Sequence, residues 1–282
     1  MRTLLPLVAA SGLLACGGAT RSAVYTAGSS PTPTPAAIRP LALANGTTQY
    51  RGVTRSHVEQ VFNGQQSAND VALAFRATGR VTTTGSSTDA QVTIDSADAV
   101  PPSTVPATEL ARIRGVSFGV TLSEAGRFVK FQGPSAFLGD AGELLASSMR
   151  QFFPRIPRAG VTPGSSWLDT MEVHLQIRGL DITVTSFNQH EAEAPTAYAG
   201  KPALPVRSQS TYRLAGSGQQ QGQVVNLDGQ GTRDARHFLA LGTGAHLGFI
   251  ARDSSAITVS VAGGSFQIPI RQLRVDSVTT LP

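Results

Sequence analysis

Apolar residues alternate with polar or small residues along much of the chain. The alternation is clearest in residues 71–81, 116–122, 167–177, 257–261 and 266–270. Successive side chains of a strand point to opposite faces of a sheet, so this pattern buries one face and leaves the other in water. One wetted face is typical of antiparallel sheets. The chain is therefore predicted to be mainly β.

One stretch has a different period. Between Asp140 and Phe153, apolar residues recur at every third or fourth position, which predicts a helix. Pro134 precedes this stretch and Pro154 stops it. A weaker helical pattern covers residues 104–113. The long helix is expected to be the main departure from β structure in the chain.

The strand-like stretches are separated by breaks rich in Gly, Ser and Thr. Hairpin turns are predicted at residues 84–87, 124–126 and 216–218. Residues 115–131 show the pattern of a strand, a turn and a strand, and residues 245–259 show it again, which suggests two pseudo-repeats. We expect one large, curved antiparallel sheet of half-barrel shape, with the 140–153 helix on its concave side. A helix about 20 Å long cannot cover all of such a sheet, so the remainder is either a filled core or a cavity.

The first residues have another composition. Arg2 is followed by an apolar run over residues 4–14, and then by Cys16, the one cysteine of the chain. This is the layout of a secretory signal, and the run is too short to cross a membrane. Leu13-Leu14-Ala15-Cys16 resembles the lipobox of bacterial lipoproteins. That resemblance implies a signal peptide over residues 1–15, lipidation of Cys16 and attachment to a membrane of the cell envelope. An ordinary cleaved signal with a chance cysteine is the alternative.

The segment after Cys16 is predicted to be a tether. Residues 16–46 are rich in Gly, Ala, Ser, Thr and Pro, with alternating prolines over residues 31–35. Such a composition buries too little apolar surface to offset the entropy of an ordered chain. In bacterial lipoproteins, an aspartate directly after the cysteine is a signal for retention in the inner membrane. Because Gly17 stands at that position here, the resemblance implies that the protein is located in the outer membrane. Residues 47–282 are expected to form a single β-rich envelope domain.

A second resemblance lies in the middle of the chain. Pro163, Gly164, Ser165, Ser166 and Trp167 match a Pro-Gly-x-Ser-Trp motif of uncharacterised bacterial lipoproteins. The layout of those proteins is similar to that of periplasmic lipoprotein carriers and lipid-binding half-barrels, and the resemblance transfers no catalytic residue. From the residues themselves we expect a turn at Pro163-Gly164, with a serine hydroxyl bonded to the backbone. The ring of Trp167 is expected to be largely buried on the apolar face of a strand, near Phe152 or Phe153.

Charge and candidate chemistry narrow the function little. The formal charge is +5 at pH 7, but the basic residues are scattered, which argues against a nucleic-acid surface. None of the histidines has the spacing of a metal site: His57, His174, His190, His237 and His246. We expect surface histidines, with His57 and Glu59 on one strand face, and no metal or other cofactor. The chain has one Gly-x-Ser-x-Gly sequence, at residues 115–119, but it begins a predicted strand instead of forming a turn from a strand into a helix. There is no marked carboxylate pair either, so no catalytic residue is assigned.

Three functions remain open. The first is a lipid-anchored, non-enzymatic protein that holds an apolar ligand, such as an acyl chain, in a half-barrel cavity. The second is a structural or interaction lipoprotein with a filled core. The third, a hydrolase assembled from residues distant in sequence, is the least favoured. The size and lining of the interior cavity distinguish the first two, and the sequence does not specify an oligomeric state.

Overall fold

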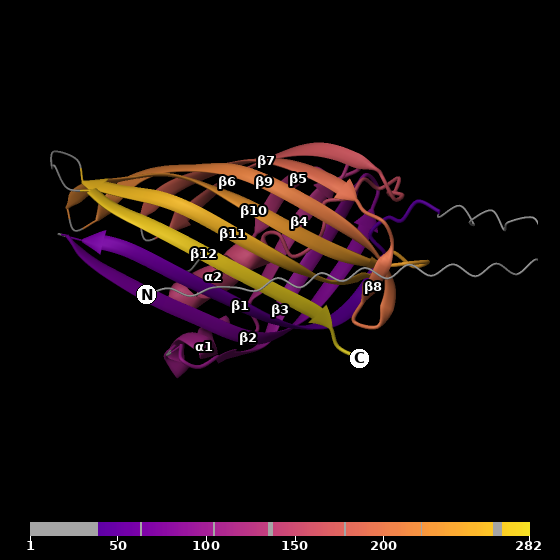
Figure 1. Ribbon diagram of the computed structural model, residues 1–282, viewed down its shortest axis with the longest axis horizontal. Helices are drawn as coiled ribbons and strands as arrows, with labels where there is room; N and C mark the ends of the chain where they lie inside the picture. The colour runs from indigo at the N-terminus through magenta and orange to yellow at the C-terminus, as the bar shows by residue number, and fades with distance from the viewer. Residues whose placement is uncertain are drawn as a thin grey trace, which may run out of the picture. The chain divides into compact units, whose positions relative to one another are not determined.

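The strands form one antiparallel sheet that is nearly closed into a barrel, as the alternation predicts (Figure 1). The computed structural model describes residues 39–282 apart from 63, 104, 135–137, 178, 221 and 262–266. The path across the sheet is β5-β4-β3-β2-β1-β12-β11-β10-β9-β7-β6, with the short β8 paired to β9. The elements are β1 (Gly46–Phe62), β2 (Gln65–Thr84), β3 (Ser87–Ala99), α1 (Ala107–Ile113), β4 (Ser117–Ser123), β5 (Phe128–Gln132), α2 (Asp140–Met149), β6 (Ser166–Ile177), β7 (Leu180–Ala192), β8 (Thr196–Tyr198), β9 (Lys201–Gln220), β10 (Gln223–Ala240), β11 (His246–Val261) and β12 (Gln267–Thr280).

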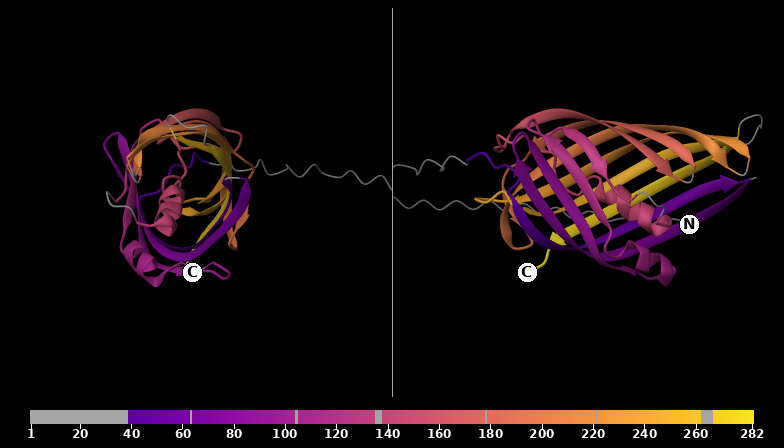
Figure 2. Two further views of the ribbon diagram at one scale, coloured as in Figure 1. Left: turned by 90° about the vertical axis from the view of Figure 1, so that its left-hand side faces the viewer. Right: turned by 180° about the vertical axis from the view of Figure 1, so that it is seen from behind.

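Helix α2 lies inside the barrel, which confirms the expected packing on the concave side (Figure 2). The helix contributes Leu145 and Met149 to the core, each at most 1% exposed. Its first turn is capped by α1, because the carboxylate of Glu109 accepts a 2.7 Å hydrogen bond from the backbone N–H of Ala141. A carboxylate at this end also complements the helix dipole. Helix α2 therefore fills one half of the barrel interior, and α1 packs against its first turn from outside the ring of strands (Figure 2).

The filled half is held together by aromatic packing. The ring of Phe152, in the turn after α2, meets Tyr50 edge-on at 5.0 Å and Phe249 at 5.5 Å. All three side chains are at most 1% exposed. Burying an aromatic or large aliphatic side chain contributes about 1.5–3 kcal/mol, so this cluster is a large part of the stability of the fold.

The structure corrects three expectations. Leu41 is 7% exposed and pairs with Val161, so the folded body includes residues assigned to the 16–46 tether and the boundary at 47 lies inside it. Residues 246–259 contain no turn but belong to the single strand β11, and the apparent repeat is absent there. The 216–218 glycines lie inside β9, where a Cβ on Gly218 would come within 2.1 Å of a neighbouring backbone oxygen. The close approach of strands, rather than a turn, requires these glycines.

The outward face of the sheet is polar. Exposed charged side chains stand on it along most of the strands: Arg51, Arg55, Arg76, Arg80, Asp89, Asp95, Glu172, Asp181, Glu191, Arg213, Asp228, Asp234, Arg252 and Arg271. Exposed apolar side chains also occur there, Leu168 and Phe187 among them. Neither of the two helices in the described residues has the length and apolar character needed to cross a bilayer.

Candidate functional site

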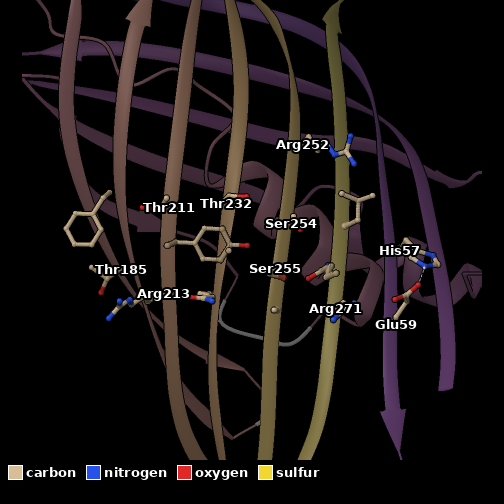
Figure 3. A pocket seen from close by; sticks show the side chains of 17 residues that line it. His57, Glu59, Thr185, Thr211, Arg213, Thr232, Arg252, Ser254, Ser255 and Arg271 are labelled. Atoms are coloured by element: carbon tan, nitrogen blue, oxygen red, sulfur yellow. Dashed lines mark hydrogen bonds and ion pairs between the residues drawn. The ribbon is translucent and has the colours of Figure 1, made fainter. Parts of the chain in front are cut away.

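A broad groove runs over the outward faces of β1, β7 and β9 to β12 (Figure 3). It measures about 1270 Å³ and is open to solvent. Threonines, serines and three arginines make up about half of its lining, the arginines being Arg213, Arg252 and Arg271. At its edge, His57 Nδ1 lies 2.8 Å from Asp70 and Nε2 lies 3.3 Å from Glu59. These two hydrogen bonds raise the pKa of His57. The groove offers polar contacts but no enclosed apolar surface.

The interior of the barrel carries a continuous row of polar side chains. Strand register places one inward polar residue of each of seven adjacent strands side by side. We call this row the polar belt; its members are Asp169, Asn188, Ser210, Arg233, Asp253, Arg274 and Ser56. All are buried except Asp253, which is partly buried. The belt crosses the lumen beside α2 and separates the filled half of the barrel from the other half.

An ion-pair network neutralises the centre of the belt. Asp276, one row away and 2% exposed, lies 3.4 Å from both Arg233 and Arg274. Its other oxygen accepts 2.7 Å hydrogen bonds from Thr54 and Ser148. Burial alone would raise the pKa of Asp276, but the two arginines and two hydroxyls hold it below its ordinary value. A buried carboxylate is tolerated only when it is paired and hydrogen-bonded in this way.

The row next to the belt is mixed and includes Ser186, Tyr212, Ser255 and Gln272, and beyond it the inward face becomes apolar. Two rows of side chains from β6, β7 and β9 to β12 line this part of the lumen. We call them the apolar mouth: Val173, Leu175, Ile182, Val184, Leu214, Leu227, Ile257, Val259, Ile268 and Ile270. Nine of the ten are only partly buried, and none belongs to a packed core cluster. Within the described residues, the mouth is therefore a concave apolar surface without a covering element.

A cavity joins the belt to the mouth. It encloses about 170 Å³ between the C-terminal end of α2 and strands β6, β7, β9, β11 and β12. A cavity of roughly 150 Å³ is enough to admit benzene, so this one can hold a ring or part of an alkyl chain. Gly216 and Gly229 lie in the mouth rows, where a Cβ would come within about 3.0 Å of Ile182 or Leu214. These glycines let the neighbouring side chains lie against the wall and keep the lumen open.

Three histidines lie in the filled half, contrary to the expectation of surface positions. His190, His237 and His246 are 1%, 3% and 3% exposed, because they occupy inward positions packed by aromatic rings. Burial is the main cause that lowers their pKa, to about 3 for His190 and His246 and well below the ordinary value for His237. His57 and His174 are partly buried and exposed, respectively, on the outward face, and His57 shares that face with Glu59 as expected.

One of these histidines touches a serine. His190 Nδ1 lies 2.7 Å from Ser208 Oγ, and the His190 ring stacks on Trp167. A serine nucleophile needs a competent base and an acid that orients it. The lowered pKa makes His190 a weak base, and its Nε2 has no hydrogen-bond partner in the described part of the chain. Neither residue lines the cavities described above, so the pair lacks the features of a catalytic site. No group of three or more metal-ligating side chains is found among the described residues either.

The mid-chain motif has a structural role. Pro163 and Gly164, with φ of +85° at the glycine, form a turn closed by the 2.9 Å bond from Ser165 N to Thr162 O. The Ser165 hydroxyl accepts a 3.0 Å bond from Thr162 N, as predicted. Trp167 is only partly buried, and it stacks on His190 rather than on the phenylalanines after the helix. Its indole N–H donates to Arg155 O at 3.0 Å. Cys16 lies outside the described residues.

Comparisons with known proteins do not identify a family. No protein-family model and no curated protein matches the chain. Among solved structures, it is similar to Neisserial surface protein A (8% identity over 84% of this chain and 99% of that one, TM-score 0.20). It is also similar to OccK2 (OpdF) of Pseudomonas aeruginosa (9% identity over 85% of this chain and 100% of that one, TM-score 0.28). A third similar structure is a loop-deletion mutant of OmpT, an outer membrane protein of Vibrio cholerae (6% identity over 83% of this chain and 99% of that one, TM-score 0.19). TM-scores this low carry no conclusion about function.

Proposed function

We propose that this protein is a non-enzymatic, lipid-anchored protein of the cell envelope that binds an apolar ligand inside the open half of its barrel. The apolar mouth is the observation that supports this proposal. Its side chains face inward on a concave wall, yet most of them are only partly buried. Apolar surface left open to water is unfavourable by about 25 cal/mol per Å², and an acyl chain laid along the wall would remove it from water.

The attachment to the membrane is proposed to be through Cys16 and not through the barrel. Barrels that span a membrane present an outward apolar band about 25 Å tall. Here the outward positions of most strands carry charged side chains, and most of the apolar positions face inward. Two or three acyl chains on a cysteine would hold the protein firmly at a bilayer, where single-chain lipids are available as ligands.

A purely structural lipoprotein would be expected to have a filled core throughout, but only one half of this barrel is filled. That half contains α2 and its aromatic cluster. The other half has the glycines and apolar rows of a binding cavity. A ligand-binding barrel in which one half is scaffold and the other half is site accounts for both observations.

The test is the binding of an uncharged apolar probe by the full chain carrying Cys16→Ser, so that no covalent acyl chain competes. N-phenyl-1-naphthylamine, whose fluorescence rises in apolar surroundings, is expected to bind and to be displaced by 1-dodecanol. Leu214→Glu places a carboxylate in the mouth and is expected to weaken binding at least about tenfold. Ala215→Glu, the next residue on the outward face, is the matched control and should bind as the parent does. Absence of binding by the parent, or equal binding by both variants, would overturn the proposal.

A further inference from the structure

Two arginines line the cavity that opens into the apolar mouth, and the charge of one acts on the other. Arg150 follows the last turn of α2, and Arg274 belongs to the polar belt on β12; both line the cavity. No carboxylate of the described residues lies within ion-pair distance of Arg150, whose guanidinium instead lies 5.6 Å over the ring of Phe131. Burial, together with the positive charge of Arg274, lowers the pKa of Arg150 to about 10. The charge of Glu143 acts on the pKa of Arg150 in the opposite direction and favours its protonated form.

The neighbouring carboxylates are already occupied. Asp253 also lines the cavity, but one of its oxygens accepts a 2.7 Å bond from Tyr212 and the other a 3.2 Å bond from Arg274. Asp276 is shared by Arg233 and Arg274. Both carboxylates are therefore already engaged by other groups, and neither forms an ion pair with Arg150 in the described part of the chain.

Unused donors accumulate at the same place. Ser210, which lines the cavity and is 5% exposed, has a hydroxyl without a partner in the described part of the chain. Arg233, 2% exposed and next to it in the belt, has Nε and Nη2 without partners there. Buried donors without partners cost free energy, and such sites bind water or a polar ligand group.

We propose that the ligand is an amphiphile with an anionic head and a single alkyl chain, bound head-inward. Arg150 and Arg274 receive the head, with the Ser210 hydroxyl beside them, and the chain runs outward along the apolar mouth. An anion between two like charges relieves their repulsion, and charge-assisted hydrogen bonds from guanidinium groups are among the strongest in proteins. This inference rests on the function proposed above and adds the chemical class and the orientation of the ligand.

The experiment compares ligands of one chain length below their micelle concentrations. Displacement of N-phenyl-1-naphthylamine from the full chain carrying Cys16→Ser is measured with laurate, dodecyl phosphate, 1-dodecanol and dodecylammonium. Laurate or dodecyl phosphate is expected to bind about ten- to hundredfold more tightly than dodecanol, and dodecylammonium more weakly than dodecanol. Whichever of laurate and dodecyl phosphate binds more tightly identifies the preferred head group.

The arginine is tested by Arg150→Met, which keeps an unbranched apolar stem. It should remove most of the advantage of the anions over dodecanol, whereas Arg150→Lys should retain part of that advantage. Arg213→Met, on the outward face, is the matched control and should leave the advantage as it is in the parent. Equal binding of anions and dodecanol, or tighter binding of dodecylammonium, would overturn the inference but leave the proposed function intact. Failure of every ligand to displace the probe would instead count against both.

Discussion

Lowering the pH from 7 to 5.5 is expected to destabilise the barrel, because three neutral histidines lie in its interior. A histidine whose pKa is depressed on folding binds more protons in the unfolded state, so stability falls as the pH falls below the unfolded value. Stability falls within the pH range between the two pKa values of each histidine. For His190 and His246 this range runs from about 6.5, the ordinary pKa, down to the pKa of about 3 in the folded protein. His237 shifts in the same direction, through burial and the nearby His246 and Arg233.

The size of the effect follows from one proton per histidine. Each contributes about 1.36 kcal/mol per pH unit inside the window, and somewhat less near its upper edge. Three buried histidines therefore remove about 4 kcal/mol between pH 7 and 5.5, out of a typical total of about 5–15 kcal/mol. For a domain of this size the melting temperature should fall by roughly 8–16 °C. His57 acts in the opposite direction, because its pKa is raised by Asp70 and Glu59, but it lies at the surface.

Thermal unfolding followed by circular dichroism at pH 7.0, 6.5, 6.0 and 5.5 measures this dependence. His246→Phe provides the specific test, since neither imidazole nitrogen of His246 meets hydrogen-bond geometry with a partner among the described residues. The variant should melt with about two-thirds of the parental pH dependence and lose no stability at pH 7. His174→Phe, at an exposed position, should melt with the full dependence. A melting temperature that stays constant to within about 2 °C over this range, or a full dependence in His246→Phe, would refute the reasoning.

Three further outcomes follow from the structure. Trp167→Ala should lower the free energy of unfolding by about 3 kcal/mol, because the ring no longer stacks on His190. Trp167→Phe should lower it by about 1 kcal/mol, because the indole hydrogen bond is lost. Urea unfolding midpoints equal to that of the parent would contradict both expectations. Leu41→Ala should cost about 2–3 kcal/mol, since Leu41 packs into the body beside Val161, whereas a body that begins at residue 47 would show no change in the same assay. Cys16→Ser should release the protein from membranes or leave its signal uncut, and the lipoprotein assignment fails if fractionation and processing both match the parent.

The sequence predicts the secondary structure well where the pattern is local. Period-two alternation identifies long stretches of β2, β4 and β6, and the three- and four-residue spacing identifies α2. Both signals depend only on which face of an element meets the core. The turn at Pro163-Gly164 is likewise predicted correctly, because φ of +85° at Gly164 is a property of two adjacent residues.

The polar belt could not be predicted in this way. Arg233, Asp253 and Arg274 become neighbours only through the register of β10, β11 and β12. In the sequence, the polar residues around Asp253 suggest a turn, whereas in the barrel they continue β11 with Asp253 turned inward to Arg274. A buried polar group needs partners from other strands. Those partners are set by the register of the strands, which the sequence alone does not specify.

The most direct test of the account is to identify what the barrel holds when it is isolated from cells. The full chain and its Leu214→Glu and Ala215→Glu variants are purified without detergent as the Cys16→Ser form, and non-covalently bound lipid is extracted and analysed by mass spectrometry. The account predicts about one single-chain amphiphile per molecule of the parent and of Ala215→Glu, and little in Leu214→Glu. Absence of lipid from the parent, or equal amounts in the two variants, would contradict the claim that the apolar mouth is a ligand site.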